Sequence, residues 1–209
     1  MDGATVDTAQ RAHRMIRASI LSGEFTAGSM LSESVLATAM SMSRTPVRSA
    51  LSRLQDEGLV RIYPKRGALV RELTSAEIRE SAQVRHAFEC AGVQIGDPDA
   101  RRTLGRRMLK NLDSQEKALR RRDFPDFATL SMQFHRGFVE LTNNTAMLAF
   151  YDRLQDHQYL SIIRNPTVSH EPDLVLAEHR SLLDHAESGD WIAFSTLLRE
   201  HQSHGHEAQ

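Results

Sequence analysis

The chain has little that would suit a secreted or membrane-bound protein. Among its 209 residues there is one cysteine, Cys90, which cannot form a disulfide within the chain and is expected to be a small buried apolar side chain. No run of about 18 apolar residues exists, so no membrane-spanning helix is expected. Residues 1–7 have neither the basic start nor the apolar run of a secretory signal. These absences predict a cytoplasmic protein.

The net charge of the chain is small, but the charged residues are unevenly distributed. The formal net charge is −1, yet residues 1–72 hold 10 basic and 7 acidic side chains, whereas residues 73–209 hold 16 and 20. Nine of the ten histidines also lie in the second part. A basic first part and an acidic, histidine-rich second part predict two domains with different tasks, over residues 1–72 and 77–209, joined by a linker at 73–76.

The first part shows three predicted helices followed by a hairpin. Apolar residues four apart predict a helix over 8–21, and Ser32 and then Ser43 or Thr45 are expected to cap two more. Two β-rich segments flank a turn at 64–67, which predicts a hairpin. Three helices and a hairpin in about 70 residues predict a winged helix-turn-helix.

The second part carries helical patterns only. Breaks at glycine, proline, asparagine and aspartate divide it into six predicted helices, near 75–96, 99–122, 124–143, 145–164, 171–188 and 190–203. Connections this short favour antiparallel packing of neighbouring helices. The predicted fold is mostly α: a winged helix-turn-helix followed by an antiparallel six-helix bundle.

Basic side chains gather at the start of the third helix and at the wing. Arg44 and Arg48 are four residues apart, so they project from one face, opposite the apolar stripe. The start of such a helix enters the major groove, where arginine binds guanine edges or phosphates. A solvated basic surface is the alternative. Together with the capping positions and the wing tip, the predicted DNA contacts are Ser43, Arg44, Thr45, Arg48, Lys65, Arg66 and Gly67.

Three histidines complete apolar stripes of different helices. His135, His179 and His201 are expected to point into the bundle, where an unpaired polar group is costly. Neutral imidazole is the commonest metal ligand, so a metal site is one interpretation, and satisfied core histidines are the other. Arg85 also shares a face with apolar residues. A buried arginine needs an anion, either an organic acid or Glu89 one turn later.

An ordered set of residues carries a family resemblance. It comprises Gly23, Gly28, Leu31, Ser32, Glu33, Leu36, Ala37, the segment 43–51, Leu54, Glu57, Gly58, Leu59, Pro64, Arg66, Gly67 and Val70. It resembles the DNA-binding head of GntR-family transcription regulators, and the second part is similar to the helical ligand-binding (FCD) domain of the FadR-like subfamily, in a six-helix variant. The resemblance implies a homodimer on a pseudo-palindromic operator. Ser34 replaces an arginine of some members, which puts one DNA contact in doubt.

The resemblance also implies a ligand site. Metal-binding members of the subfamily use three histidines and an aspartate one turn before the first, and His135, His179 and His201 match the histidines while Ser131 replaces the aspartate. Three histidines suit zinc or nickel. The subfamily tends to carry an arginine at position 85 near a carboxylate effector. The implied ligand-binding residues are Arg85, Ser131, His135, His179 and His201.

These features predict a DNA-binding transcription repressor that responds to a small organic acid, and not an enzyme. Binding of the acid through a divalent metal is one interpretation of the histidines. A metal-dependent hydrolase would need a general base beside the histidines. Asp126 and Glu140 do not clearly share the face of His135, and the basic head would have no role. An architectural DNA binder would not need the inward polar set. The regulator is therefore the favoured interpretation.

Overall fold

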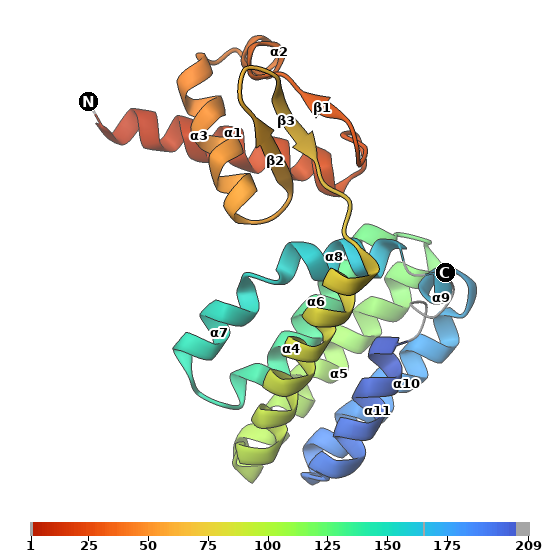
Figure 1. The fold of residues 1–209 in the computed structure, drawn as a ribbon. Helices are drawn as coiled ribbons and strands as arrows, with labels where there is room; N and C mark the ends of the chain where they lie inside the picture. Colours follow the sequence, from red (N-terminus) through yellow and green to blue (C-terminus); the bar gives the residue numbers. More distant parts are fainter. Residues whose placement is uncertain (1, 165, 204–209) are drawn as a thin grey trace. The chain divides into compact units, whose positions relative to one another are not determined.

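The computed structural model describes residues 2–164 and 166–203. The chain divides into two compact units, Met1–Leu73 and Thr74–Gln209. In the part of the chain that the structure describes, no helix combines the length and apolar character needed to cross a bilayer. Figure 1 shows the helices and strands of both units.

The first unit is a three-helix head with a small antiparallel sheet (Figure 1). Its elements are α1 (Asp2–Leu21), β1 (Met30–Leu31), α2 (Glu33–Ala39), α3 (Arg44–Asp56), β2 (Val60–Tyr63) and β3 (Gly67–Val70). The sheet has the order β1-β3-β2, with Val60 opposite Val70 and Tyr63 opposite Gly67. The winged helix-turn-helix prediction is confirmed. The sequence did not predict β1, because two residues carry no periodicity.

The core of the head lies between α1 and α3. Ile16 of α1 is fully buried, as are Val47 and Leu54 of α3. Ser32 and Ser43 stand at the N-caps of α2 and α3, as expected, but neither side chain accepts a capping hydrogen bond. The Ser32 hydroxyl instead bonds to that of Ser34 at 2.9 Å, so the predicted caps are correct in position and wrong in mechanism.

The second unit is an all-helical bundle, as predicted, but with more segments. Its helices are α4 (Ser75–Ile95), α5 (Pro98–Arg120), α6 (Phe124–Glu140), α7 (Thr145–Asp152), α8 (Gln155–Arg164), α9 (Pro166–His170), α10 (Pro172–Ser188) and α11 (Trp191–Ser203). The single helix expected over 145–164 is divided at Arg153 and Leu154, and α9 was not expected. Helices this short depend on tertiary packing, which periodicity does not reveal.

Helices α4 and α6 lie in close contact, and this contact positions the side chains that they direct into the bundle. A Cβ atom on Gly92 of α4 would lie 1.8 Å from the carbonyl oxygen of Phe138 of α6, so only glycine fits there. Phe134 and Phe138 are fully buried in the core and meet edge to face, with ring centroids 4.9 Å apart. The next turn of each helix, towards its N-terminus, carries Glu89 and His135 respectively.

Candidate DNA-binding surface and candidate metal centre

Helix α3 presents a basic, exposed face at its first turns. Its apolar stripe is buried, whereas Ser43, Arg44, Thr45 and Arg48 are all exposed. Free backbone N–H groups at the helix start add to the positive potential of the arginines. The surface can therefore accept phosphates and base edges, as the sequence pattern indicates.

Arg48 is held by an ion pair that the sequence did not predict. Its Nε and Nη2 atoms donate to the Glu33 carboxylate of α2 at 3.0 and 2.8 Å, while 68 % of its side chain stays exposed. These hydrogen bonds hold the pKa of Glu33 below its ordinary value. The two residues are fifteen positions apart on different helices, so no periodicity links them.

The wing tip has a structural requirement for glycine. Lys65 and Arg66 are exposed, and Lys65 has a φ of 63°. Gly67 has a φ of 114°, and a Cβ there would lie 2.3 Å from the carbonyl oxygen of Leu31. The glycine is thus required by the packing of β1 against β3, in addition to the close approach to DNA that we predicted.

The three predicted histidines meet inside the second unit. His135 of α6, His179 of α10 and His201 of α11 form a cluster, the histidine triad, in which one ligand atom of each lies within 4.8 Å of the others. His135 and His179 are buried, and His201 is partly buried. The Nε2 atoms of His179 and His201 are 3.2 Å apart.

Each ring of the histidine triad is fixed through its other nitrogen. The Nδ1 atoms of His135, His179 and His201 lie 2.7 Å from side-chain oxygens of Glu89, Gln115 and Glu178, respectively. A second-shell acceptor of this kind sets the tautomer of a metal-binding histidine and makes the opposite nitrogen more basic. Sequence reasoning missed Gln115 and Glu178, and named Glu89 only as a partner of Arg85.

A chain of amides settles the direction of the His179 hydrogen bond. Asn111 donates through Nδ2 to the carbonyl oxygen of Leu130 at 3.1 Å, so its Oδ1 must accept from Gln115 Nε2, 2.6 Å away. The Oε1 of Gln115 then faces His179 and can only accept. His179 therefore donates from Nδ1, and its Nε2 carries the lone pair.

Burial favours the neutral forms of His135 and His179 and of the carboxyl group of Glu89. Burial lowers the pKa of His135 and His179 well below the ordinary value, and it raises the pKa of Glu89 to about 7 against the opposing effect of Arg85. The neutral ring of His179 donates from Nδ1 and directs its Nε2 lone pair towards His201, where a cation can accept it.

The triad fits a metal ion by distance and by donor type. Nitrogen ligands at 2.0–2.1 Å from a tetrahedral zinc lie about 3.3 Å apart, close to the observed separation of 3.2 Å between His179 and His201. An adjoining cavity of about 40 Å³ is lined by Ser131, Glu178 and Ile162, among others. It has room for about one further oxygen ligand.

Arg85 lies in the same buried network. Its Nε is 3.4 Å from Glu89 Oε1, and the Tyr151 hydroxyl donates to that carboxylate oxygen at 2.8 Å. The internal ion pair that the sequence left open is therefore present. Arg85 also lowers the pKa of both His135 and His179 through its charge, after the larger effect of burial.

Comparison with known proteins identifies the class. Residues 8–70 match the family model of bacterial regulatory proteins, gntR family, and residues 80–204 match that of the FCD domain. A winged head joined to such a domain defines a DNA-binding transcription regulator. The chain belongs to the GntR family of regulators and carries an FCD domain, which favours the regulator over the hydrolase.

Individual relatives are similar to this chain over most of their length. The chain is 29 % identical to an HTH-type transcriptional regulator in an unstable DNA locus of Streptomyces ambofaciens, over 89 % of this chain and 78 % of that protein. It is 26 % identical to the HTH-type transcriptional repressor RspR of Escherichia coli, over 92 % and 84 %. A crystal structure of a GntR regulator from Rhodococcus sp. RHA1 superposes with a TM-score of 0.77 and 25 % identity, over 93 % of both chains.

Proposed function

We propose that the protein is a homodimeric repressor that binds a pseudo-palindromic operator and releases or tightens it in response to a small organic acid bound at a metal. The observation that carries the sensor part is the convergence of three imidazoles, each anchored through Nδ1 to a side-chain oxygen. An acceptor behind each ring is the arrangement that orients metal-binding histidines, and it leaves the other nitrogens of the three rings near one another.

The DNA-binding part rests on the exposed face of α3 and the wing. Arg44 and Arg48 reach base edges or phosphates from the start of the recognition helix, and Ser43 and Thr45 offer hydroxyls to the backbone. Lys65, Arg66 and Gly67 approach the adjacent groove or backbone. In a homodimer, two heads would engage half-sites about 34 Å apart or a multiple of that distance.

The sensor part assigns a role to each buried polar residue. His135, His179 and His201 hold a divalent metal, zinc or nickel, which supplies a positive charge and an open position for a carboxylate oxygen. Ser131, in the cavity wall, offers a hydroxyl to that ligand. Arg85 stands close enough to the triad to attract the acid, and Glu89 balances its charge when the site is empty.

DNA-binding measurements on the full chain test this function. An operator would be selected from a random DNA library with the purified protein, and its affinity measured by fluorescence anisotropy with chelator, with zinc, and with zinc plus candidate acids. We expect salt-sensitive binding, a preference over random duplex, and a change in affinity when metal and acid are added. His179→Ala should bind the operator as the metal-free protein does and show no response.

The DNA-binding role and the sensor role can be disproved separately. Absence of salt-sensitive binding to any duplex would overturn the DNA-binding role. Operator binding that stays the same in wild type under every metal and acid condition would overturn the sensor role and leave an architectural DNA binder.

A further inference from the structure

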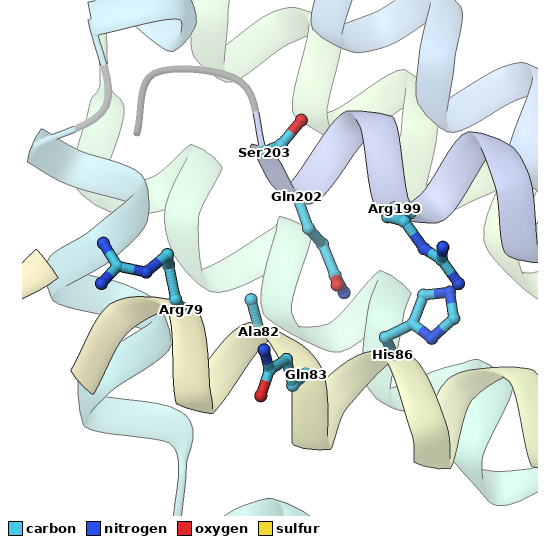
Figure 2. A pocket seen from close by; sticks show the side chains of 7 residues that line it. All are labelled: Arg79, Ala82, Gln83, His86, Arg199, Gln202 and Ser203. Carbon is cyan, nitrogen blue, oxygen red and sulfur yellow. The ribbon is translucent and has the colours of Figure 1, made fainter. Parts of the chain in front are cut away.

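A second cavity lies on a different side of α4, against α11. It has a volume of about 490 Å³, and we call it the α4–α11 cleft. Its α4 wall consists of residues spaced three, four and seven apart, and thus on one helix face, and its α11 wall includes two residues three apart. These are Arg79, Ala82, Gln83 and His86 of α4 and Arg199 and Gln202 of α11 (Figure 2).

The cleft is separate from the histidine triad and larger than its cavity. The triad cavity holds about 40 Å³, and none of its described lining residues lines the cleft. Pockets that bind metabolite-sized molecules usually have volumes of about 300–1,000 Å³. The cleft therefore has room for a whole metabolite, whereas the triad cavity has room for the groups that complete a metal shell.

The charge of the cleft is positive and unbalanced. Arg79 and Arg199 are exposed, and neither has a carboxylate partner among the residues that the structure describes. Other arginines of this unit, such as Arg136 and Arg180, do form ion pairs. No described lining residue is acidic, so the cleft attracts anions.

A lining residue of the cleft carries a buried donor without a partner. The Nε2 atom of Gln202 is inaccessible to solvent and has no hydrogen-bond partner among the described residues. Figure 2 shows Gln202 extending from α11 towards α4, between the two walls. A buried donor that lacks a partner is unfavourable, so the Gln202 side chain would gain a hydrogen bond by turning towards a ligand oxygen in the cleft.

The two arginines are placed at the two ends of the cleft. Arg79 and His86 are two helical turns apart on α4, a rise of about 10 Å. Figure 2 shows Arg79 at one end and Arg199 with His86 at the other. The Nε2 atom of His86 lies 3.0 Å from the carbonyl oxygen of Ser195, a hydrogen bond that ties α4 to α11 at the second end.

We propose that the α4–α11 cleft binds an extended organic dianion, such as an aliphatic dicarboxylate. One carboxylate binds Arg79 and the other binds Arg199, and Gln202 turns its amide into the cleft to donate to the ligand between them. The aliphatic body of the ligand packs against Ala82 and the methylene groups of the lining side chains. This site is independent of the metal and effector role proposed for the histidine triad.

Calorimetric titration of the zinc-loaded full chain with adipate tests the site. We expect one adipate to bind per chain, and Arg79→Gln and Arg199→Gln each to weaken binding about tenfold or more, since each removes a charged hydrogen bond. Hexanoate, with the same chain length and one carboxylate, should bind about tenfold more weakly. Arg106→Gln, which removes an exposed charge of α5, is the matched control and should leave adipate binding unchanged.

The histidine triad provides the discriminating variant. His179→Ala should lose zinc and keep adipate binding, which would support two separate sites. Adipate binding that is lost in His179→Ala and kept in both arginine variants would place the dianion at the triad and overturn the proposal. Equal losses in Arg106→Gln and the cleft variants, or no adipate binding at millimolar concentration, would also overturn it.

Discussion

The Nε2 atoms of His179 and His201 face each other at 3.2 Å, and each ring is anchored from behind through Nδ1. The amide chain from Leu130 through Asn111 and Gln115 leaves the Nε2 of His179 without a proton to donate. The Nε2 lone pair of His179 is thus held in position for a cation, beside a second imidazole nitrogen. This relationship links the packing of the bundle to the proposed sensor.

The first prediction concerns the carboxylate behind His135. Glu89→Gln keeps the shape of the side chain but removes the charge that makes His135 more basic. We expect the affinity for zinc to fall about 10–100-fold. Competition with a fluorescent chelator measures it, and Glu200→Gln, an exposed residue of α11, is the control for net charge. Equal affinities in the two variants would show that Glu89 does not support a metal ligand.

The second prediction concerns the serine that replaces an aspartate. Ser131 lies one turn before His135 and lines the triad cavity. Ser131→Asp should add an anionic fourth ligand and tighten zinc binding by more than the ~10-fold that one second-shell contact contributes. Ser131→Asn has a similar size without the charge and should stay within a few-fold of wild type. Zinc affinity that is unchanged or weaker in Ser131→Asp would place the metal elsewhere.

The third prediction tests the close approach of α4 and α6. Gly92→Ala places a methyl group 1.8 Å from the carbonyl oxygen of Phe138, so the two helices must separate. We expect the free energy of unfolding of this unit to fall by about 1–3 kcal/mol. Zinc affinity should fall too, because Glu89 and His135 lie one turn away on the same helices. Gln94→Ala, an exposed position on α4, should change stability by less than about 0.5 kcal/mol.

The fourth prediction concerns base recognition by Arg48. Arg48→Ala should weaken operator binding by about 1–3 kcal/mol while affecting random duplex much less, if Arg48 binds a base edge. Anisotropy titrations on both DNAs measure the two losses. Losses of equal size would assign Arg48 to a phosphate instead.

The fifth prediction concerns Glu33, the ion-pair partner of Arg48. Glu33 places a negative charge on the proposed DNA-binding surface and forms an ion pair with Arg48. Glu33→Gln should therefore tighten binding to random duplex and reduce the ratio of operator to random affinity, since Arg48 becomes free to contact any phosphate. An unchanged ratio at every salt concentration would show that the ion pair does not contribute to specificity.

Much of the fold could be predicted from local patterns. Periodic apolar residues and glycine breaks located the three helices and the hairpin of the head, and they located the long helices of the bundle. They missed the two-residue strand β1, the break that divides the helix expected over 145–164 into α7 and α8, and the short helix α9, because these features depend on contacts distant in sequence. The stripe positions of His135, His179 and His201 were sufficient to bring the triad together.

The surroundings of these residues could not be predicted in the same way. Gln115 and Glu178 lie on helical faces that also carry ordinary polar residues, and only the packing of α5, α10 and α11 shows that they support the triad. The pairing of Arg48 with Glu33 likewise depends on how α2 and α3 meet. Local periodicity indicates which side chains point inward, but it does not indicate which residue of another helix they meet.

X-ray absorption at the zinc edge tests the central claim most directly. Full-length protein loaded with one equivalent of zinc should show three imidazole nitrogens and one oxygen at about 2.0–2.1 Å. His179→Ala should show fewer imidazoles or no bound zinc. A wild-type spectrum with one imidazole or none, or one that His179→Ala reproduces, would contradict a metal centre at the histidine triad.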